Sequence, residues 1–268
     1  MIVRPVERVG GLFLRLLDHI GRVVMLVLEA ARWLWRGLVR KRVRMGRDAI
    51  VAQIVRVGVR SIFIVALVSG CVGLILAFQL APPLDEFGQR DAVANIIAVA
   101  VLRELGPLIG AIVLTGFAGA SIAAEIGTMV VSEEIEALEA HALNPVRFLV
   151  VPRVVATILS MTALGVVASF VAIVASLFIS VTVLDIPLTT YIDNTLRQAK
   201  LVDFYTGVGK ATVFGLLIGA IACANGLKVS GGAAGVGKAT TGTVVQSVVS
   251  IVIADLLFTA IFYALKLT

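Results

Sequence analysis

The chain has 268 residues, of which 59% are hydrophobic and only 15% charged, and its mean hydropathy is +1.05. Soluble domains carry about 25% charged residues, so this composition argues against a water-soluble globule and for a chain that lies mostly in lipid. The two cysteines, Cys71 and Cys223, both lie in apolar stretches, which excludes a disulfide scaffold and a Cys-x-x-Cys metal site.

The first 60 residues form a basic, amphipathic segment. They hold 13 of the 23 Lys and Arg residues, including the run from Arg40 to Arg47. Apolar residues recur at helical spacing beside arginines, at Leu12, Leu16, Val23, Leu26 and Leu34. The pattern predicts interfacial helices over residues 1–60, rather than a signal peptide or a nucleic-acid-binding arm. A soluble amphipathic helix packed on a partner protein is the alternative.

Long charge-poor runs predict five membrane spans within one membrane domain, residues 61–268. The runs are residues 61–84, 105–124 (after an apolar lead-in at 92–102), 154–184, 204–227 and 239–265. About 20 helical residues cross a hydrocarbon core of about 30 Å, so each run is long enough to span it. Open sheets cannot satisfy their backbone in lipid. The predicted fold class is therefore an all-α membrane protein with five transmembrane helices.

The distribution of charge between the loops predicts the orientation. The segments on the side of residue 1 hold 17 cations and those on the opposite side hold 4. Because cytosolic loops carry the excess of Lys and Arg, we expect the N-terminus in the cytosol and the C-terminus outside.

Four ionisable residues lie within the outer half of the predicted spans. They are Arg103, Glu104, Lys210 and Asp255, and their formal charges sum to zero. Such groups cost several kcal/mol in lipid unless they are paired or hydrated. They predict either ion pairs that hold the helices together or a polar pocket that opens outward, where Arg103 or Lys210 meets an anionic headgroup. Pro107, two residues after Leu105, predicts a kink at this point.

Small residues predict close helix packing. Gly106–Gly110 and Gly215–Gly219 are both Gly-x-x-x-Gly motifs. Such faces let helix backbones approach one another in lipid. We expect packing within the chain, with a dimer seam in the second or fifth span as the alternative.

The cytosolic segment 132–144 predicts a short acidic helix between the second and third spans. Ser132 can cap its N-terminus, and glutamates follow in the first turn, where the helix dipole favours them. Ile135, Leu138 and Ala142 share one face. The helix is either a solvated cap on the bundle or the surface on which a cytosolic motor pushes.

The segment from Gly232 to Lys238 resembles a phosphate-binding loop but lacks its context. Ala239 stands where Ser or Thr should hold Mg²⁺, and an apolar helix precedes the segment instead of a strand. We expect a flexible glycine-rich inner loop, so any ATP that drives this protein binds elsewhere. The sequence also lacks a Gly-x-Ser-x-Gly motif and a metal-ligand cluster, which predicts a chain without catalytic residues or metal.

Several ordered motifs together resemble the MlaE/YrbE permease family. They are LRELGP at 102–107, AAEIGTM at 123–129, EIEAL at 134–138, NPVRFLVVPR at 144–153 and GGAAGVGKATT at 231–241. The resemblance covers about residues 50–265. It implies the permease subunit of an ABC transporter that moves phospholipid or related lipids between the bacterial inner membrane and the outer envelope. Such a permease works as a dimer with two cytosolic ATPase subunits, which bind the ATP, and a periplasmic MCE lipid carrier.

The resemblance also assigns roles to residues. Arg103, Glu104 and Leu105 match the polar stretch near an outward lipid cavity, and Lys210 matches a basic position on the helix after the outer loop. We expect these residues, with Asp255, to form the substrate site. The segment Glu133–Ala142 matches the coupling helix that seats in the ATPase, and its expected contact residues are Glu133, Glu134, Ile135, Glu136, Leu138, Glu139 and Ala142. The N-terminal helices match the interfacial elbow that packs against MCE anchor helices. Arginine is usual in the family where Phe117, Val130, Lys238 and Gly242 stand.

Two other functions remain open at this point. In an ion-coupled secondary carrier, Glu104 and Asp255 would relay protons, although five spans without an inverted repeat do not favour it. A purely structural membrane anchor for a larger assembly is the second alternative.

Overall fold

The computed structural model describes residues 3–39 and 47–266, and all regular secondary structure within them is helical. Arg40, Lys41, Arg42 and Arg44 of the basic run lie outside the described residues, and so do the side chains of Leu12 and Leu16. The expectation for these residues therefore stays a prediction.

Five helical stretches are long and apolar enough to cross a membrane, which confirms the predicted number. They are Arg47–Glu86, Ala92–Val131, Val146–Thr182, Leu201–Gly226 and Gly232–Ala264. All five begin before the predicted runs, and the first two also end after them, because a helix does not stop where its apolar residues stop. We refer to these stretches as spans 1 to 5.

Several spans are built from more than one helical segment. Span 1 consists of α2 (Arg47–Val57), the short 3-10 turn η1 (Val59–Ser61) and α3 (Ile62–Glu86). Span 2 consists of α4 (Ala92–Ala100), η2 (Val101–Leu105), α5 (Gly106–Leu114), η3 (Thr115–Gly119) and α6 (Ala120–Val131). Span 3 joins η4 (Val146–Val150) to α8 (Val151–Thr182), whereas spans 4 and 5 are the single helices α10 (Leu201–Gly226) and α11 (Gly232–Ala264).

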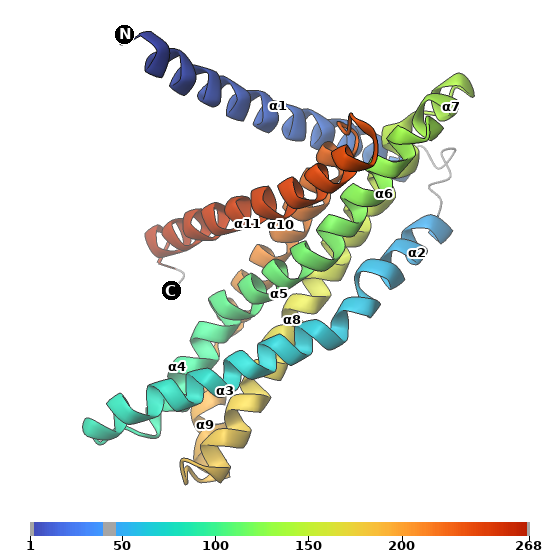
Figure 1. Cartoon of the computed structure of the whole chain (residues 1–268). Coiled ribbons are helices and arrows are strands. Elements are labelled where there is room, and N and C mark those ends of the chain that lie inside the picture. The colour runs from blue at the N-terminus through green and yellow to red at the C-terminus, as the bar shows by residue number, and fades with distance from the viewer. Residues whose placement is uncertain (1–2, 40–46, 267–268) are drawn as a thin grey trace.

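The short helices mark the two ends of the bundle. The acidic segment forms α7 (Glu134–Ala140) between spans 2 and 3, and α9 (Leu188–Gln198) lies between spans 3 and 4. Figure 1 shows α7 and the start of α2 at one end and α9 with the α3–α4 connection at the other. Tyr191 anchors α9, because its side chain is buried and its hydroxyl lies 2.6 Å from Ser176 Oγ of α8.

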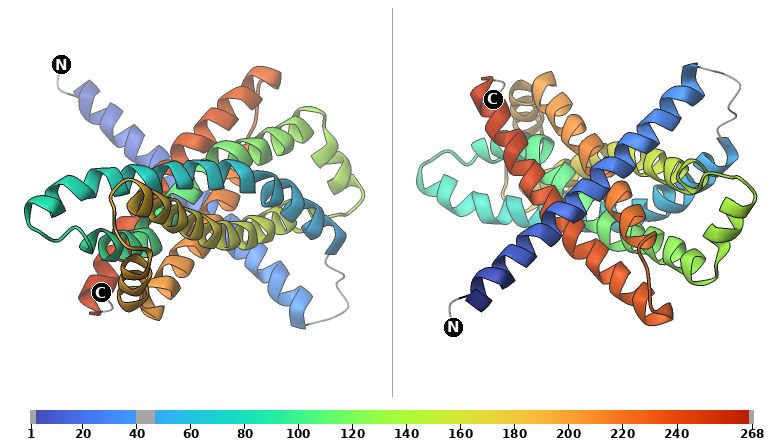
Figure 2. Two further views of the ribbon diagram at one scale, coloured as in Figure 1. Left: turned by 90° about the horizontal axis from the view of Figure 1, so that it is seen from below. Right: turned by 90° about the horizontal axis from the view of Figure 1, so that it is seen from above.

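The N-terminal segment is one long amphipathic helix, α1 (Val3–Val39), which lies across the bundle against α10, η4 and α8 (Figure 2). Ala30 is buried in this contact, and Trp33 packs beneath the guanidinium of Arg147 at 5.6 Å. The Asn144 side-chain amide also donates to Glu29 at 3.4 Å. The second helix expected before residue 60 is α2, and it continues through η1 into span 1.

Helix α8 lies at the centre of the bundle and packs on α3, α5 and α10. The contacts depend on glycines, as the motifs predict. A Cβ at Gly215 would lie 2.6 Å from the Thr157 carbonyl oxygen, and one at Gly219 would lie 2.2 Å from the Thr157 hydroxyl. Gly106, in the other Gly-x-x-x-Gly motif, faces Ser169 of α8 in the same way. Both Gly-x-x-x-Gly motifs therefore pack within the chain.

Span 5 is the least buried span. Only Thr243, Ser247 and Ile251 of α11 are buried, and they form a single stripe. Large apolar side chains cover the rest of the helix, among them Val245, Val249, Val252, Leu256 and Leu257. This surface is suited to lipid or to another helix.

Candidate functional site

Charged side chains from spans 2, 4 and 5 meet in the half of the bundle nearer α9. We call this set the Lys210 cluster: Arg103, Glu104, Asp203, Lys210 and Asp255. The sequence analysis places four of its five members in the outer half of the spans. The structure shows that Glu104, Lys210 and Asp255 contact one another, whereas Arg103 forms a separate pair with Asp203 beside them.

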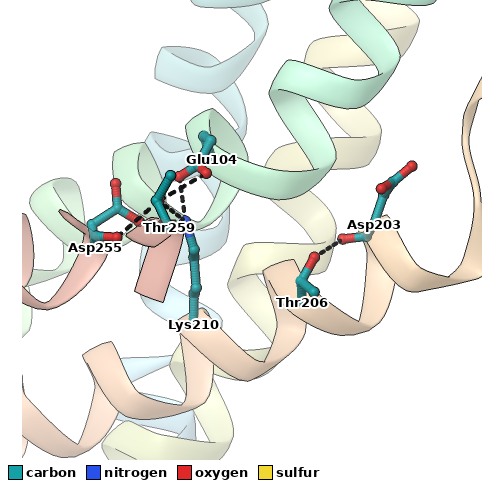
Figure 3. Close-up of polar contacts among 6 residues, drawn as sticks. All are labelled: Glu104, Asp203, Thr206, Lys210, Asp255 and Thr259. Atoms are coloured by element: carbon teal, nitrogen blue, oxygen red, sulfur yellow. Dashed lines mark hydrogen bonds and ion pairs between the residues drawn. The ribbon is translucent and has the colours of Figure 1, made fainter. Parts of the chain in front are cut away.

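Lys210 is the centre of the cluster. Its side chain is 1% exposed, and its ammonium forms ion pairs with Glu104 of η2 and with Asp255 of α11, the latter at 2.9 Å (Figure 3). The ammonium also donates to the Thr259 hydroxyl at 2.9 Å. A buried ammonium is costly unless it is fully paired, and these three partners from two other spans supply that pairing.

Thr259 links the two carboxylate-bearing segments. Its hydroxyl lies 3.0 Å from Glu104 Oε1 and 2.9 Å from the Asp255 carbonyl, so it can donate to either. Sequence reasoning missed this residue, because a threonine one turn after a buried aspartate carries no distinctive signal.

Arg103 does not join Lys210, although it is adjacent to Glu104. Its guanidinium pairs with Asp203, which is 1% exposed. The other Asp203 oxygen accepts from the Lys200 backbone N–H at 3.0 Å, and Thr206 donates to the Asp203 carbonyl at 2.9 Å (Figure 3). Asp203 thus caps the start of α10 and holds Arg103. Sequence reasoning missed it, although its place in the first turn of an apolar helix is typical of a capping residue.

The backbone around Pro107 positions Arg103 and Glu104. Both lie in η2, a π-helical turn, directly before the proline. Proline has no N–H to donate to the preceding turn, and π turns in α-helices occur at such interruptions, frequently at functional sites. The expected kink is therefore a local change of helix type. A Cβ at Gly207 would lie 2.0 Å from the Leu102 carbonyl oxygen, so α10 approaches η2 closely enough for Lys210 to reach Glu104.

With Asp203 included, the Lys210 cluster has three carboxylates and two cations, a formal charge of −1. Lys210 uses all three donors of its ammonium, so an anionic headgroup can bind it only by displacing a partner, whereas Arg103 contacts Asp203 through Nε and a guanidinium offers four further N–H donors. The Arg103 and Glu104 side chains are 21% and 34% exposed and form the accessible edge of the cluster. Leu105 is half-buried at the end of η2.

A second group of charges lies nearer α7. We call it the Glu125 cluster: Arg56, Glu125 and Arg153. Arg56 Nη1 lies 2.8 Å from one Glu125 oxygen, and Arg153 Nη2 lies 3.2 Å from the other. The cluster therefore ties α2 and α8 to α6. Glu125 enters the sequence analysis only within the AAEIGTM motif at 123–129 and has no predicted partner there, because nothing in the sequence places Arg56 beside it.

Helix α7 exposes its glutamates and turns Ile135 and Leu138 partly inward, with Ile135 packed against the hydrophobic core. Its start differs from the prediction. Ser132 does not cap the helix, because its hydroxyl lies 2.9 Å from the Thr128 carbonyl and 3.1 Å from Glu134 Oε1. The chain turns at Glu133, whose φ of 59° is left-handed, so the cap falls one residue later.

The end of α7 also differs from the prediction. The helix ends at Ala140, and Ala142 lies beyond it with a left-handed φ of 57°. Ala142 is therefore not on the same helical face as Ile135 and Leu138. The chain must leave the helix before Asn144, because that residue precedes a proline.

The glycine-rich segment 232–238 is helical, which corrects the expectation of a flexible loop. Gly231 and Gly232 both have left-handed backbones, with φ of 86° and 69°, and α11 begins at Gly232. Lys238 lies in the second turn of the helix, so its own backbone N–H is used within the helix. Within residues 3–39 and 47–266, no group of three or more His, Cys, Asp or Glu is arranged to hold a metal ion.

Comparison with known proteins identifies the family. Residues 50–261 match the family described as Permease MlaE. A probable ABC transporter permease protein of Rickettsia prowazekii is 35% identical over 214 residues, which are 80% of this chain and 83% of the relative. A probable ABC transporter permease protein of Synechocystis is 34% identical over 212 residues, 79% of this chain and 81% of the relative.

A plant protein matches along the same region. Protein TRIGALACTOSYLDIACYLGLYCEROL 1, chloroplastic, of Arabidopsis thaliana is 32% identical over 244 residues, 87% of this chain and 70% of that protein. The family match covers spans 2, 3 and 4 completely and nearly all of spans 1 and 5, and it includes both charge clusters. The chain therefore belongs to the MlaE family of permeases.

Proposed function

We propose that this chain is the non-catalytic permease subunit of an ABC transporter that moves phospholipid or a related lipid between the bacterial inner membrane and a periplasmic MCE carrier. The observation that carries the proposal is the fully paired, buried Lys210, which joins three spans in a chain of this family. The relatives named as probable ABC transporter permeases support the transporter class, and the Arabidopsis relative, whose name contains a diacylglycerol lipid, supports a lipid cargo.

The Lys210 cluster would hold the segments around the lipid site together until a lipid binds. It joins η2, α10 and α11, so separating these segments requires Lys210 to exchange at least one carboxylate for another anionic group. A lipid phosphate can make that exchange, because charge-assisted hydrogen bonds to its oxygens replace those to a carboxylate. Arg103, Glu104, Leu105, Lys210 and Asp255 are the proposed substrate residues, with Asp203 positioning Arg103.

Helix α7 would receive the motion of the ATPase. Its exposed acidic residues are Glu133, Glu134, Glu136 and Glu139, and they form a surface for a basic groove. Ile135 packs against the core, so a push on α7 reaches α6 directly. Leu138 and Ala142 complete the proposed contact, the latter from the turn beyond the helix.

The remaining parts of the assembly follow from the same proposal. The ATPase subunits bind ATP in the cytosol, on the side of α7 and residue 1, and the C-terminus faces the periplasm. The exposed stripe of α11 is suited to a second permease chain. A cavity of about 770 Å³ between α1 and the end of α10, lined by Met25, Leu26 and Trp33, is suited to the anchor helix of the MCE protein.

Charge reversal on α7 tests the coupling role. We expect the triple variant Glu133→Lys, Glu134→Lys, Glu136→Lys to fold normally, because all three side chains are exposed, and to lose most of its copurifying ATPase. Asp193→Lys, an exposed acid on α9, is the matched control and should keep the ATPase. Mild-detergent purification with mass spectrometry measures both. Unchanged assembly of the triple variant would refute the coupling role.

The ion-coupled carrier remains the second candidate, because Glu104 and Asp255 both contact Lys210 and protonation of either would weaken the cluster. Reconstituted protein separates the two functions. Lipid transfer that needs ATP and the ATPase subunit supports the ABC permease, whereas transfer that follows a pH gradient without any ATPase supports the carrier.

A further inference from the structure

A small polar cavity lies between α2 and α6, on the α7 side of the bundle. Its volume is about 140 Å³, room for several water molecules at about 30 Å³ each. Its lining combines basic, polar and apolar side chains: Gln53, Arg56, Arg60, Phe117, Ser121 and Glu125. It is separate from the Lys210 cluster, with which it shares no residue.

The charge around this cavity is unbalanced. Glu125 is the single acid of the lining, and both of its oxygens are already occupied by Arg56 and Arg153. Arg60 is exposed, and its side chain has no ion pair or hydrogen bond within the described part of the chain. Arg153 does not itself line the cavity, so the lining, with Arg56 and Arg60 against Glu125, has a formal charge of +1.

The cations retain hydrogen-bonding capacity. The Arg56 side chain is 50% exposed and uses one nitrogen on Glu125, although a guanidinium offers five N–H donors. The buried Nε of Arg153 and the buried amide oxygen of Gln53 also have no partner among the described residues. Buried polar groups are nearly always satisfied, so the Gln53 oxygen, which lines the cavity, indicates a polar occupant with a hydrogen to donate, such as water or the hydroxyl of a lipid headgroup.

The position of the cavity along span 1 indicates where that occupant comes from. Arg56 and Arg60 directly precede the charge-free run that begins at Ser61. The cavity therefore lies where the first span leaves the hydrocarbon, at the depth of lipid headgroups. Phe117, which also lines the cavity and is 46% exposed, offers an apolar contact for the part of a lipid beside its phosphate.

We propose that this cavity binds a phosphate group through Arg56 and Arg60, as the headgroup phosphate of a membrane lipid or as free phosphate. Arginine binds phosphate oxygens with paired N–H donors, and the net charge of +1 on the lining matches the single negative charge of a lipid phosphodiester. The site goes beyond the proposed transport function, because it concerns binding on the α7 side and needs no ATP-driven step.

Titration of the full-length chain in detergent, followed by native mass spectrometry, tests the proposal. The probes are phosphatidylglycerol, diacylglycerol, which lacks the phosphate, and inorganic phosphate. We expect phosphatidylglycerol to bind and diacylglycerol not to bind. Arg60→Gln should weaken binding about tenfold, the effect of one charge-assisted hydrogen bond, and Arg56→Gln by at least as much. Arg47→Gln, on the same helix but outside the cavity, should change it less than about twofold.

The outcomes separate the sources and the alternatives. Loss of phosphatidylglycerol in Arg60→Gln but not in Arg47→Gln assigns the site to a lipid phosphate. Binding of inorganic phosphate alone, with the same dependence on Arg60, assigns it to the free anion. Equal losses in Arg47→Gln and Arg60→Gln, equal binding of diacylglycerol, or no effect of either cavity variant would overturn the proposal. Thermal unfolding of each variant checks its fold, and Arg60→Gln removes no ion pair.

Discussion

The Lys210 cluster and the Glu125 cluster are built from the same residue types with opposite imbalance. In the first, two carboxylates surround one buried ammonium. The nearby Arg103–Asp203 pair is neutral, so the whole cluster has a formal charge of −1. In the second, two guanidinium groups share one carboxylate, which leaves +1. The first cluster joins spans 2, 4 and 5, whereas the second joins spans 1, 2 and 3.

The two clusters differ in the burial of their cations, and this difference determines how easily each ion pair can be replaced. Lys210 is 1% exposed, so its pairing cannot be replaced by water, and breaking it requires another ionic partner. Arg56 is 50% exposed, so water already competes with Glu125 and weakens that pair. The Lys210 cluster is thus suited to a switch between two fully paired states, and the Glu125 cluster to reversible binding at a surface.

The largest expected effect is the loss of the buried ammonium. Lys210→Met leaves Glu104 and Asp255 facing each other without a cation, which should destabilise the chain by about 3–5 kcal/mol. Thermal unfolding in detergent measures it. The neutral triple variant, Lys210→Met with Glu104→Gln and Asp255→Asn, should recover most of this stability but not lipid transfer. If Lys210→Met unfolds like the wild type, the cluster does not hold the spans together.

The corresponding change in the other cluster should have a smaller effect. Glu125→Gln leaves two arginines without their carboxylate, and we expect a loss of about 1–3 kcal/mol because both retain other contacts with water or the Leu149 carbonyl. Glu133→Gln, an exposed glutamate on the same side, is the control and should change stability by less than about 0.5 kcal/mol. If Glu125→Gln loses as much stability as Lys210→Met does, the two clusters do not differ in the way that their burial predicts.

A loss of similar size, about 1–3 kcal/mol, is expected for Gly207→Ala. The new Cβ would lie 2.0 Å from the Leu102 carbonyl oxygen, so α10 must move away from η2 and carry Lys210 with it. Gly209→Ala, two residues later, meets nothing within 4 Å and should be neutral or slightly stabilising. Unfolding temperature and lipid transfer should both fall in Gly207→Ala alone; equal behaviour of the two variants would contradict the close approach.

The smallest expected effect depends on pH and concerns α1. Burial, with smaller contributions from Arg22 and Lys228, lowers the pKa of His19 below its usual 6.5, and Asp18 opposes them. Because the unfolded chain binds the proton more readily, stability is complete above pH 6.5 and declines slightly as the pH falls below it. The protection of α1 amides from hydrogen exchange, measured relative to the intrinsic rate at each pH, should decrease as the pH falls below 6.5, and His19→Gln should abolish the decrease. A loss of protection on raising the pH would contradict the sign.

Much of this fold follows from local features of the sequence. Charge-free runs predict the five spans because lipid requires long apolar helices. The inward face of Ile135 and Leu138 follows from helical periodicity. The proximity of Glu104, Lys210 and Asp255 follows from their similar depth, since ionisable groups in lipid must find partners.

The features that escaped prediction depend on tertiary contacts. Asp203 and Glu125 have their roles because α10 approaches η2 and α2 approaches α6, and no spacing in the sequence encodes these distances. The helical start of α11 is misjudged for another reason. Its glycines indicate a loop in a water-soluble protein. At the edge of a bilayer, however, a helix satisfies the backbone N–H and C=O groups within the segment itself.

The lengths of spans 1 and 2 have a further consequence. Each contains 40 residues, which as a helix measure about 60 Å at 1.5 Å per residue. A bilayer with its headgroups is only about 40–45 Å thick, and a tilt of about 20° shortens the rod very little. Spans 1 and 2 are therefore about 10–15 Å longer than such a bilayer is thick. Another protein can thus contact the ends of spans 1 and 2 without entering the lipid.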